Sequence, residues 1–128
     1  QYENMSKLQG VKKTVMKPGD GKTYPKTGDE LTMHYTGYLH GQPDKVFDSS
    51  VRRGTPFKFR IGIGHVIQGW DEGVIKMSLG EKAKLEIASD YAYGERGAGS
   101  TIPPNSDLDF EVELLKIGES GGSGCTIL

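Results

Sequence analysis

Covalent catalysis has few candidate side chains in this sequence. The single cysteine, Cys125, lies in a Gly/Ser-rich stretch that could not hold a general base beside its thiol, and no nucleophile elbow on a predicted strand-to-helix turn marks an activated serine. The histidines, His34, His40 and His65, have neither metal-ligand spacing nor cysteine neighbours. We therefore expect no metal site, and we expect His34 to be a solvated strand residue rather than a catalytic one.

A short glycine pattern, Gly62-Ile63-Gly64, superficially resembles a nucleotide-binding loop. Ile67 stands where the third glycine of Gly-x-Gly-x-x-Gly belongs, and the flanking residues do not predict a parallel βαβ unit. The sequence therefore predicts no cofactor.

Aromatic side chains are the unusual feature that remains, at Tyr35, Phe47, Phe57, Phe59, Trp70, Tyr91, Tyr93 and Phe110. Any one of them is most simply explained as a core residue. Trp70 could instead form the floor of a cleft, because it follows a Gly-rich segment of the chain. Tyr91 and Tyr93 could form the rim of that cleft. An aromatic cup with a few polar tips is the kind of site that binds an apolar ring.

Alternation of apolar and polar residues predicts the strands that would position these side chains. It is clearest at 108–114, and the other predicted strands cover 11–17, 30–39, 46–49, 57–61 and 83–87. Such regular alternation is typical of an antiparallel sheet with one wet face.

One segment has near-helical spacing of its apolar residues, at Val66, Trp70, Val74 and Met77. It predicts a single short helix between His65 and Gly80. One helix can cover one face of a sheet that bends around it, so we expect an α+β domain. The long Gly-, Tyr- and Pro-rich loop at 91–104 is predicted to be a functional flap.

Length and composition are those of one globular domain. The chain has 128 residues, of which 34% are hydrophobic and 26% charged, and no apolar run approaches the length of a membrane-spanning helix. Lys and Arg number 16 against 17 Asp and Glu, interleaved, so we expect no nucleic-acid partner. We assign residues 1–9 to an N-terminal extension or an expression remnant, 10–117 to the domain and 118–128 to a flexible tail.

The tail carries a candidate lipidation site. Cys125-Thr126-Ile127-Leu128 fits a C-a-a-X box, whose final Leu points to geranylgeranylation and hence to a membrane anchor. Against this, residues 118–124 contain no Lys or Arg, and the segment also resembles a Gly/Ser linker followed by a short graft. A single cysteine and no leader-like start favour a cytoplasmic protein.

Six short stretches resemble the FKBP family of peptidyl-prolyl isomerases, the immunophilins that bind tacrolimus and rapamycin. They are His34-Tyr35-Thr36-Gly37, Phe47-Asp48-Ser49-Ser50, Val66-Ile67-x-Gly69-Trp70-Asp71-Glu72-Gly73, Gly80-Glu81-Lys82-Ala83, Asp90-Tyr91-Ala92-Tyr93-Gly94 and Ile102-Pro103-Pro104. They occur in family order and near-family spacing over about residues 10–117. The resemblance implies a five-stranded antiparallel half-barrel wrapped around one short helix, and isomerisation of X–Pro bonds.

The same resemblance implies a pocket for a prolyl ring, with Trp70 as its floor and Asp48 and Tyr93 as polar tips. Its other residues would be Tyr35, Phe47, Phe57, Val66, Ile67, Ile102 and Phe110. The catalytic residues would be Phe47, Asp48, Trp70, Tyr93 and Phe110. The expected partners of this monomer are X–Pro peptides and macrolides, whose complexes would engage calcineurin or TOR-type kinases.

Two questions stay open from the residues alone. Asp48 could orient groups near the twisting carbonyl, or it could simply hydrogen-bond Tyr35 and shape the pocket. The whole chain could also be chiefly a binding module that anchors a partner's proline without needing turnover. Departures from the family pattern at 40–46 and 98–101 are expected to change the rim rather than the floor. His65 stands where the family usually has a longer polar residue, and the resemblance implies that this change is tolerated, because the family uses mainly backbone there.

Overall fold

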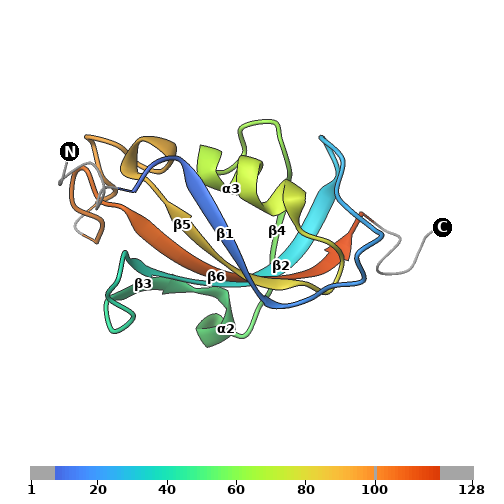
Figure 1. Ribbon diagram of the computed structural model, residues 1–128. Helices are drawn as coiled ribbons and strands as arrows, with labels where there is room; N and C mark the ends of the chain where they lie inside the picture. Colours follow the sequence, from blue (N-terminus) through green and yellow to red (C-terminus); the bar gives the residue numbers. More distant parts are fainter. Residues whose placement is uncertain (1–7, 100, 119–128) are drawn as a thin grey trace.

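A computed structural model describes residues 8–99 and 101–118 of the chain (Figure 1). Its strands are β1 (Val11–Lys17), β2 (Glu30–Leu39), β3 (Val46–Ser49), β4 (Phe57–Arg60), β5 (Lys82–Ile87) and β6 (Leu108–Ile117). Its helical elements are α2 (Ser50–Arg53), α3 (Gln68–Gly73) and the 3-10 turns η1 (Val74–Lys76) and η2 (Ser89–Tyr91). None of the helices in the described ranges is long and apolar enough to cross a membrane. The candidate lipidation site, Cys125, lies outside the described residues.

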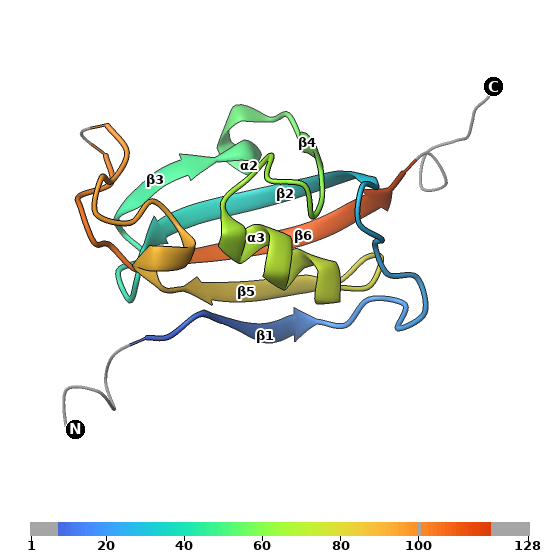
Figure 2. The same cartoon turned by 90° about the horizontal axis from the view of Figure 1, so that it is seen from above.

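The strands form one antiparallel sheet in the order β1-β5-β6-β2, with β3 and β4 both pairing with the outer edge of β2. Residues 36–38 of β2 pair with β3, and residues 30–33 pair with β4. Six strands therefore fill five positions across the sheet, because α2 interrupts the fifth. The expected half-barrel around a short helix is confirmed, and Figure 2 shows α3 lying across one face of the sheet.

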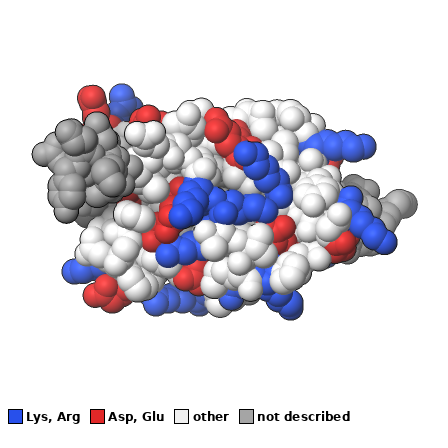
Figure 3. All heavy atoms as spheres, viewed as in Figure 1, with Lys and Arg blue, Asp and Glu red and all other residues white. Residues whose placement is uncertain are grey.

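The core lies between α3 and this face. Leu31, Met33, Leu85, Val112 and Leu114 are completely buried there. The alternate positions of the same strands carry polar and charged side chains, as the period of two predicted. Figure 3 shows acidic side chains beside the basic ones on the face of Figure 1.

The predicted helix forms, but it is shorter and changes type. Regular α-helix ends at Gly73, and the chain continues as η1 to Lys76. In the flap at 91–104, Ala98 and Ile102 form an antiparallel bridge with N–O distances of 2.9 and 3.1 Å.

The short helix α2 was not predicted. Ser49 caps its start, because its side chain accepts a hydrogen bond from the Arg52 N–H at 3.2 Å. Gly54 ends it in the left-handed conformation, at φ 77°. A single helical turn is too short to produce a periodic pattern in the sequence.

Candidate active site

A cavity of about 190 Å³ opens between the sheet, the start of α3 and the flap. It is lined by Tyr35, Phe47, Asp48, Phe57, His65, Val66, Ile67, Trp70, Tyr93 and Phe110. The structure thus brings together nine of the ten residues predicted to bind a ligand. The tenth, Ile102, is not among the lining residues; it is 4% exposed and packs in the hydrophobic core.

Trp70 is the centre of an aromatic cluster at the base of the cavity. Its ring meets that of Tyr35 at 5.0 Å between centroids and 71°, and that of Phe110 at 5.1 Å and 85°. Phe57 adds a third edge-to-face contact at 5.8 Å. Such pairs contribute about 0.5–1.5 kcal/mol each beyond the area that they bury, so the floor is rigid as well as apolar.

Water does not reach the polar atom of this floor. Trp70 is 5% exposed, and its Nε1 is buried without a hydrogen-bond acceptor among the described residues. An unpaired buried N–H ordinarily costs about 1–3 kcal/mol. The neighbouring aromatic faces are weak acceptors that can offset part of this cost. The floor is therefore a dry surface.

Gly37 on β2 lets two rings approach the cavity. A Cβ at this position would lie 2.6 Å from Cε2 of Phe110 and 2.8 Å from Cζ of Phe47. These two rings pack edge to face at 5.6 Å. Only glycine allows both rings to lie against the backbone of β2, so Gly37 sets the width of the cavity on this side.

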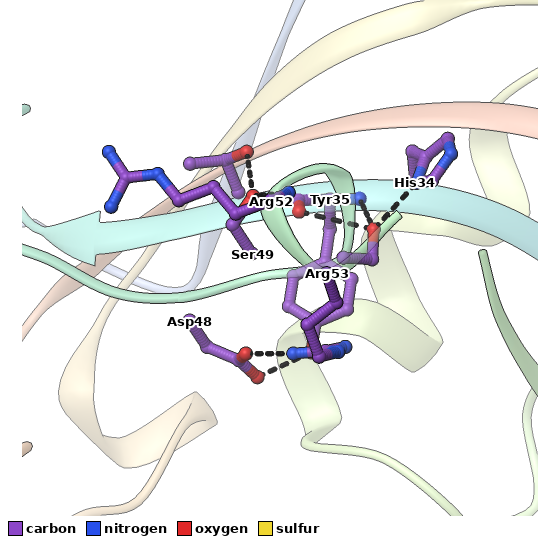
Figure 4. Close-up of polar contacts among 8 residues, drawn as sticks. His34, Tyr35, Asp48, Ser49, Arg52 and Arg53 are labelled. Carbon is purple, nitrogen blue, oxygen red and sulfur yellow. Dashed lines mark hydrogen bonds and ion pairs between the residues drawn. The ribbon is translucent and has the colours of Figure 1, made fainter. Parts of the chain in front are cut away.

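The polar wall of the cavity is a network of three side chains (Figure 4). Asp48 accepts hydrogen bonds from the Tyr35 hydroxyl and from the Arg53 guanidinium. Arg53 also donates to the Tyr35 hydroxyl at 3.2 Å, and its guanidinium lies 5.7 Å from the centroid of the Tyr35 ring. Burial, followed by the bond to Asp48, raises the pKa of Tyr35. The carboxylate is thus held and neutralised by its neighbours.

Arg53 was missed by the sequence analysis. It is the last residue of α2, and the one-turn helix brings it back toward Asp48, five positions earlier. The signals available in the sequence were Ser49 as a cap and Gly54 as a stop, but neither fixes the direction of the Arg53 side chain.

Ser50 fixes the backbone of Tyr35. Its fully buried hydroxyl accepts from the Tyr35 N–H at 2.8 Å and donates to the Tyr35 carbonyl at 3.3 Å. The Nδ1 atom of His34 lies 2.8 Å from the same hydroxyl. His34 is half-buried rather than fully solvated, and through Ser50 it helps to hold Tyr35 in place (Figure 4).

The mouth of the cavity carries hydrogen-bonding groups that have no partner among the described residues. Tyr93 is 40% exposed, and burial followed by the charge of Asp48 raises the pKa of its hydroxyl. Ile67 immediately precedes α3, and its N–H has no acceptor among the described residues. Asp71 stabilises the turn that precedes Ile67, because the Asp71 carboxylate accepts hydrogen bonds from the N–H groups of Gly62 at 2.8 Å and Gly64 at 3.1 Å.

A group that could hold a metal lies away from the cavity, formed by His40, Glu86 and Asp109. Nδ1 of His40 is already 2.7 Å from Oδ1 of Asp109. The ammonium of Lys84 lies 3.6 Å from Glu86 and 3.8 Å from Asp109. These groups satisfy one another, so we assign no metal to them.

Comparison with known proteins agrees with this geometry. Residues 21–115 match the family described as FKBP-type peptidyl-prolyl cis-trans isomerase. The chain is 61% identical over 108 residues to FK506-binding protein 1 of Rhizopus delemar, covering 84% of this chain and 98% of the relative. It is 60% identical over 110 residues to the peptidyl-prolyl cis-trans isomerase of Schizosaccharomyces pombe, covering 86% and 96%. The chain therefore belongs to the FKBP-type peptidyl-prolyl cis-trans isomerase family.

Proposed function

We propose that the cavity holds a prolyl ring against Trp70 and accelerates rotation about the amide bond that precedes it. The observation that carries this proposal is a dry floor of edge-to-face aromatic rings below a mouth where the Tyr93 hydroxyl and the Ile67 N–H have no partner among the described residues. An apolar base fits an apolar ring, and polar groups at the rim fit the peptide on either side of that ring.

Isomerisation needs no covalent chemistry. The planar amide owes its barrier to resonance, which separates charge between oxygen and nitrogen. A half-twisted amide has lost that resonance and carries less separated charge. A site without water therefore favours the twisted form over the planar one, which is stronger binding of the transition state than of the substrate.

The required acceleration is within reach of such a site. Unaided X–Pro isomerisation takes about 10–100 s at 25 °C. Turnover at about 1,000 per second needs about four to five decades, or about 5–7 kcal/mol. Several ordinary contacts, each stronger to the twisted bond than to the planar one, supply this much.

Particular residues have distinct roles in this proposal. The Ile67 N–H and the Tyr93 hydroxyl donate to substrate carbonyls on either side of the rotating bond. Asp48 orients groups near the twisting carbonyl while it shapes the wall with Tyr35. Its two bonds from Tyr35 and Arg53 support a fixed dipole rather than a proton carrier.

The proposed macrolide ligands are tacrolimus (FK506) and rapamycin, which would occupy the same cavity. Support comes from the aromatic floor and from relatives named FK506-binding protein 1 in Rhizopus delemar and Saccharomyces cerevisiae. The bound macrolide would complete a surface for calcineurin or a TOR-type kinase at the mouth of the cavity, beside Tyr93 of the flap.

A proline-switch peptide assay tests the proposal. We expect the rate of cis-to-trans conversion to rise in proportion to protein concentration. It should fall to the uncatalysed rate when the molar concentration of tacrolimus equals that of the protein. A folded protein that leaves the rate unchanged would overturn the catalytic role. If Asp48→Val or Phe110→Tyr lost turnover but kept biological activity, the binding-module alternative would be favoured instead.

A further inference from the structure

His65 is an ionisable side chain that lines the cavity and has no partner in the part of the chain that the structure describes. Two side chains that line the cavity, Asp48 and His65, can carry a charge near neutral pH. Asp48 is paired with Arg53 and Tyr35. His65 is exposed and makes no hydrogen bond or ion pair with any described residue. A bound peptide therefore meets a free imidazole here.

The backbone fixes where this imidazole stands. Asp71 holds the preceding turn through the N–H groups of Gly62 and Gly64, and His65 follows at once. Two residues later comes Ile67, whose free N–H faces a substrate carbonyl in the proposed function. In that arrangement the twisting carbonyl, which precedes the proline, lies beside Asp48. The carbonyl left for Ile67 is then the one that follows the proline, so the next residue of the peptide passes His65.

We propose that His65 selects substrates with a carboxylate side chain immediately after the proline. This inference rests on the proposed function, since it takes the direction of the peptide from it. A protonated imidazole attracts the Asp or Glu of a Pro-Asp or Pro-Glu sequence, and a neutral imidazole does not.

The other charged groups around the mouth leave this attraction in place. Asp48 is neutralised by Arg53, and the raised pKa of Tyr93 keeps its hydroxyl neutral. On α3, the Asp71 carboxylate is engaged by two backbone N–H groups, and Glu72 accepts from Gln68 Nε2 at 2.7 Å. An ion pair at an exposed site changes affinity by about 1.5- to fivefold and weakens in salt.

The test compares two peptides, Leu-Pro-Glu and its neutral isostere Leu-Pro-Gln, by the ratio of their kcat/KM values. The variants are His65→Gln and, as a matched control, Lys12→Gln. The control removes an exposed positive charge from β1, which lies at the edge of the sheet opposite β3 and β4. The ratio is measured at about pH 6 and about pH 8, where histidine ordinarily changes charge.

We expect the ratio at about pH 6 to be about two- to fivefold higher in the unmodified protein than in His65→Gln, and the difference to shrink at about pH 8. Lys12→Gln should keep the ratio of the unmodified protein. Equal ratios in the unmodified protein and His65→Gln, or an equal fall in Lys12→Gln, would overturn the inference. So would an equal effect of His65→Gln on Glu-Pro-Leu peptides, which carry the acid before the proline. Loss of turnover for every peptide would instead overturn the proposed function on which the inference rests.

Discussion

The Arg53 guanidinium pairs with the Asp48 carboxylate along the wall of the cavity, although the two residues come from different elements, α2 and β3. Both side chains are nearly half-exposed, at 48% and 42%. A pair this exposed contributes little to folding, so its effect should be on the site.

Removing Arg53 tests this expectation. Arg53→Ala leaves Asp48 with only the Tyr35 hydroxyl, so we expect kcat/KM to fall about three- to tenfold while stability changes by less than about 1 kcal/mol. Arg52→Ala is the matched control, because this neighbouring side chain points away from Asp48 (Figure 4). Equal effects of the two variants on turnover would show that the pair has no part in the site.

Gly37 offers a test of the cavity's width. The Cβ of Gly37→Ala would collide with Phe110 and Phe47, so these rings must shift toward the cavity. We expect a loss of about 1–3 kcal/mol in stability and a fall in tacrolimus affinity by calorimetry. Gly73→Ala is the control, since its Cβ meets Leu85 of the core at 3.0 Å. Tacrolimus affinity that is unchanged in Gly37→Ala would contradict the assignment of this wall.

The tyrosine hydroxyls of the site predict a specific dependence on alkaline pH. Burial is the main cause that raises the pKa of both Tyr35 and Tyr93, and the charge of Asp48 adds to it. The folded protein therefore holds these protons more tightly than the unfolded chain. The resulting stability is fully present below about pH 10 and is lost as the pH rises through the folded pKa values.

Denaturant unfolding at a series of pH values measures this effect. We expect the free energy of unfolding to decline above about pH 10, and the decline to be smaller in Tyr93→Phe. A decline of the same size in Tyr93→Phe would show that its hydroxyl is not perturbed.

Lys13 and Glu81 form a largely buried ion pair that ties β1 to the chain before β5. Lys13 Nζ lies 2.6 Å from Glu81 Oε2, and Glu81 is 5% exposed. Lys13→Met leaves that carboxylate with the Ser78 N–H alone, so we expect a loss of about 1–3 kcal/mol in chemical denaturation. Lys12→Met removes the adjacent, exposed lysine and should change stability by less than about 0.5 kcal/mol. If Lys13→Met left the free energy of unfolding unchanged, the ion pair would contribute no more stability than separated, solvated charges.

Much of the fold could be predicted from the sequence because the sheet has one buried face. That face imposes a strict alternation on β2, β5 and β6, and their ends were predicted to within a few residues. The helix around Trp70 was also predicted, but its late change to η1 was not, since both helix types place apolar residues at similar spacing.

The site was less predictable where it depends on single turns. Arg53 reaches Asp48 only because α2 is one turn long. His65 reaches the cavity because Asp71 binds the backbone N–H groups of the turn that precedes it. Ile102 is bridged to Ala98, and both residues pack in or against the hydrophobic core. Side-chain direction in such short elements is set by a few hydrogen bonds, which residue pattern does not reveal.

The central claim is that a prolyl ring rests on Trp70 in a dry cavity. The direct test is calorimetric titration of Trp70→Leu with tacrolimus, with far-ultraviolet circular dichroism to check the fold. We predict that the fold is retained and that affinity falls at least about tenfold, because the substitution removes three edge-to-face partners and the flat floor. Unchanged affinity in the folded variant would contradict the account, since the ring would then lie elsewhere.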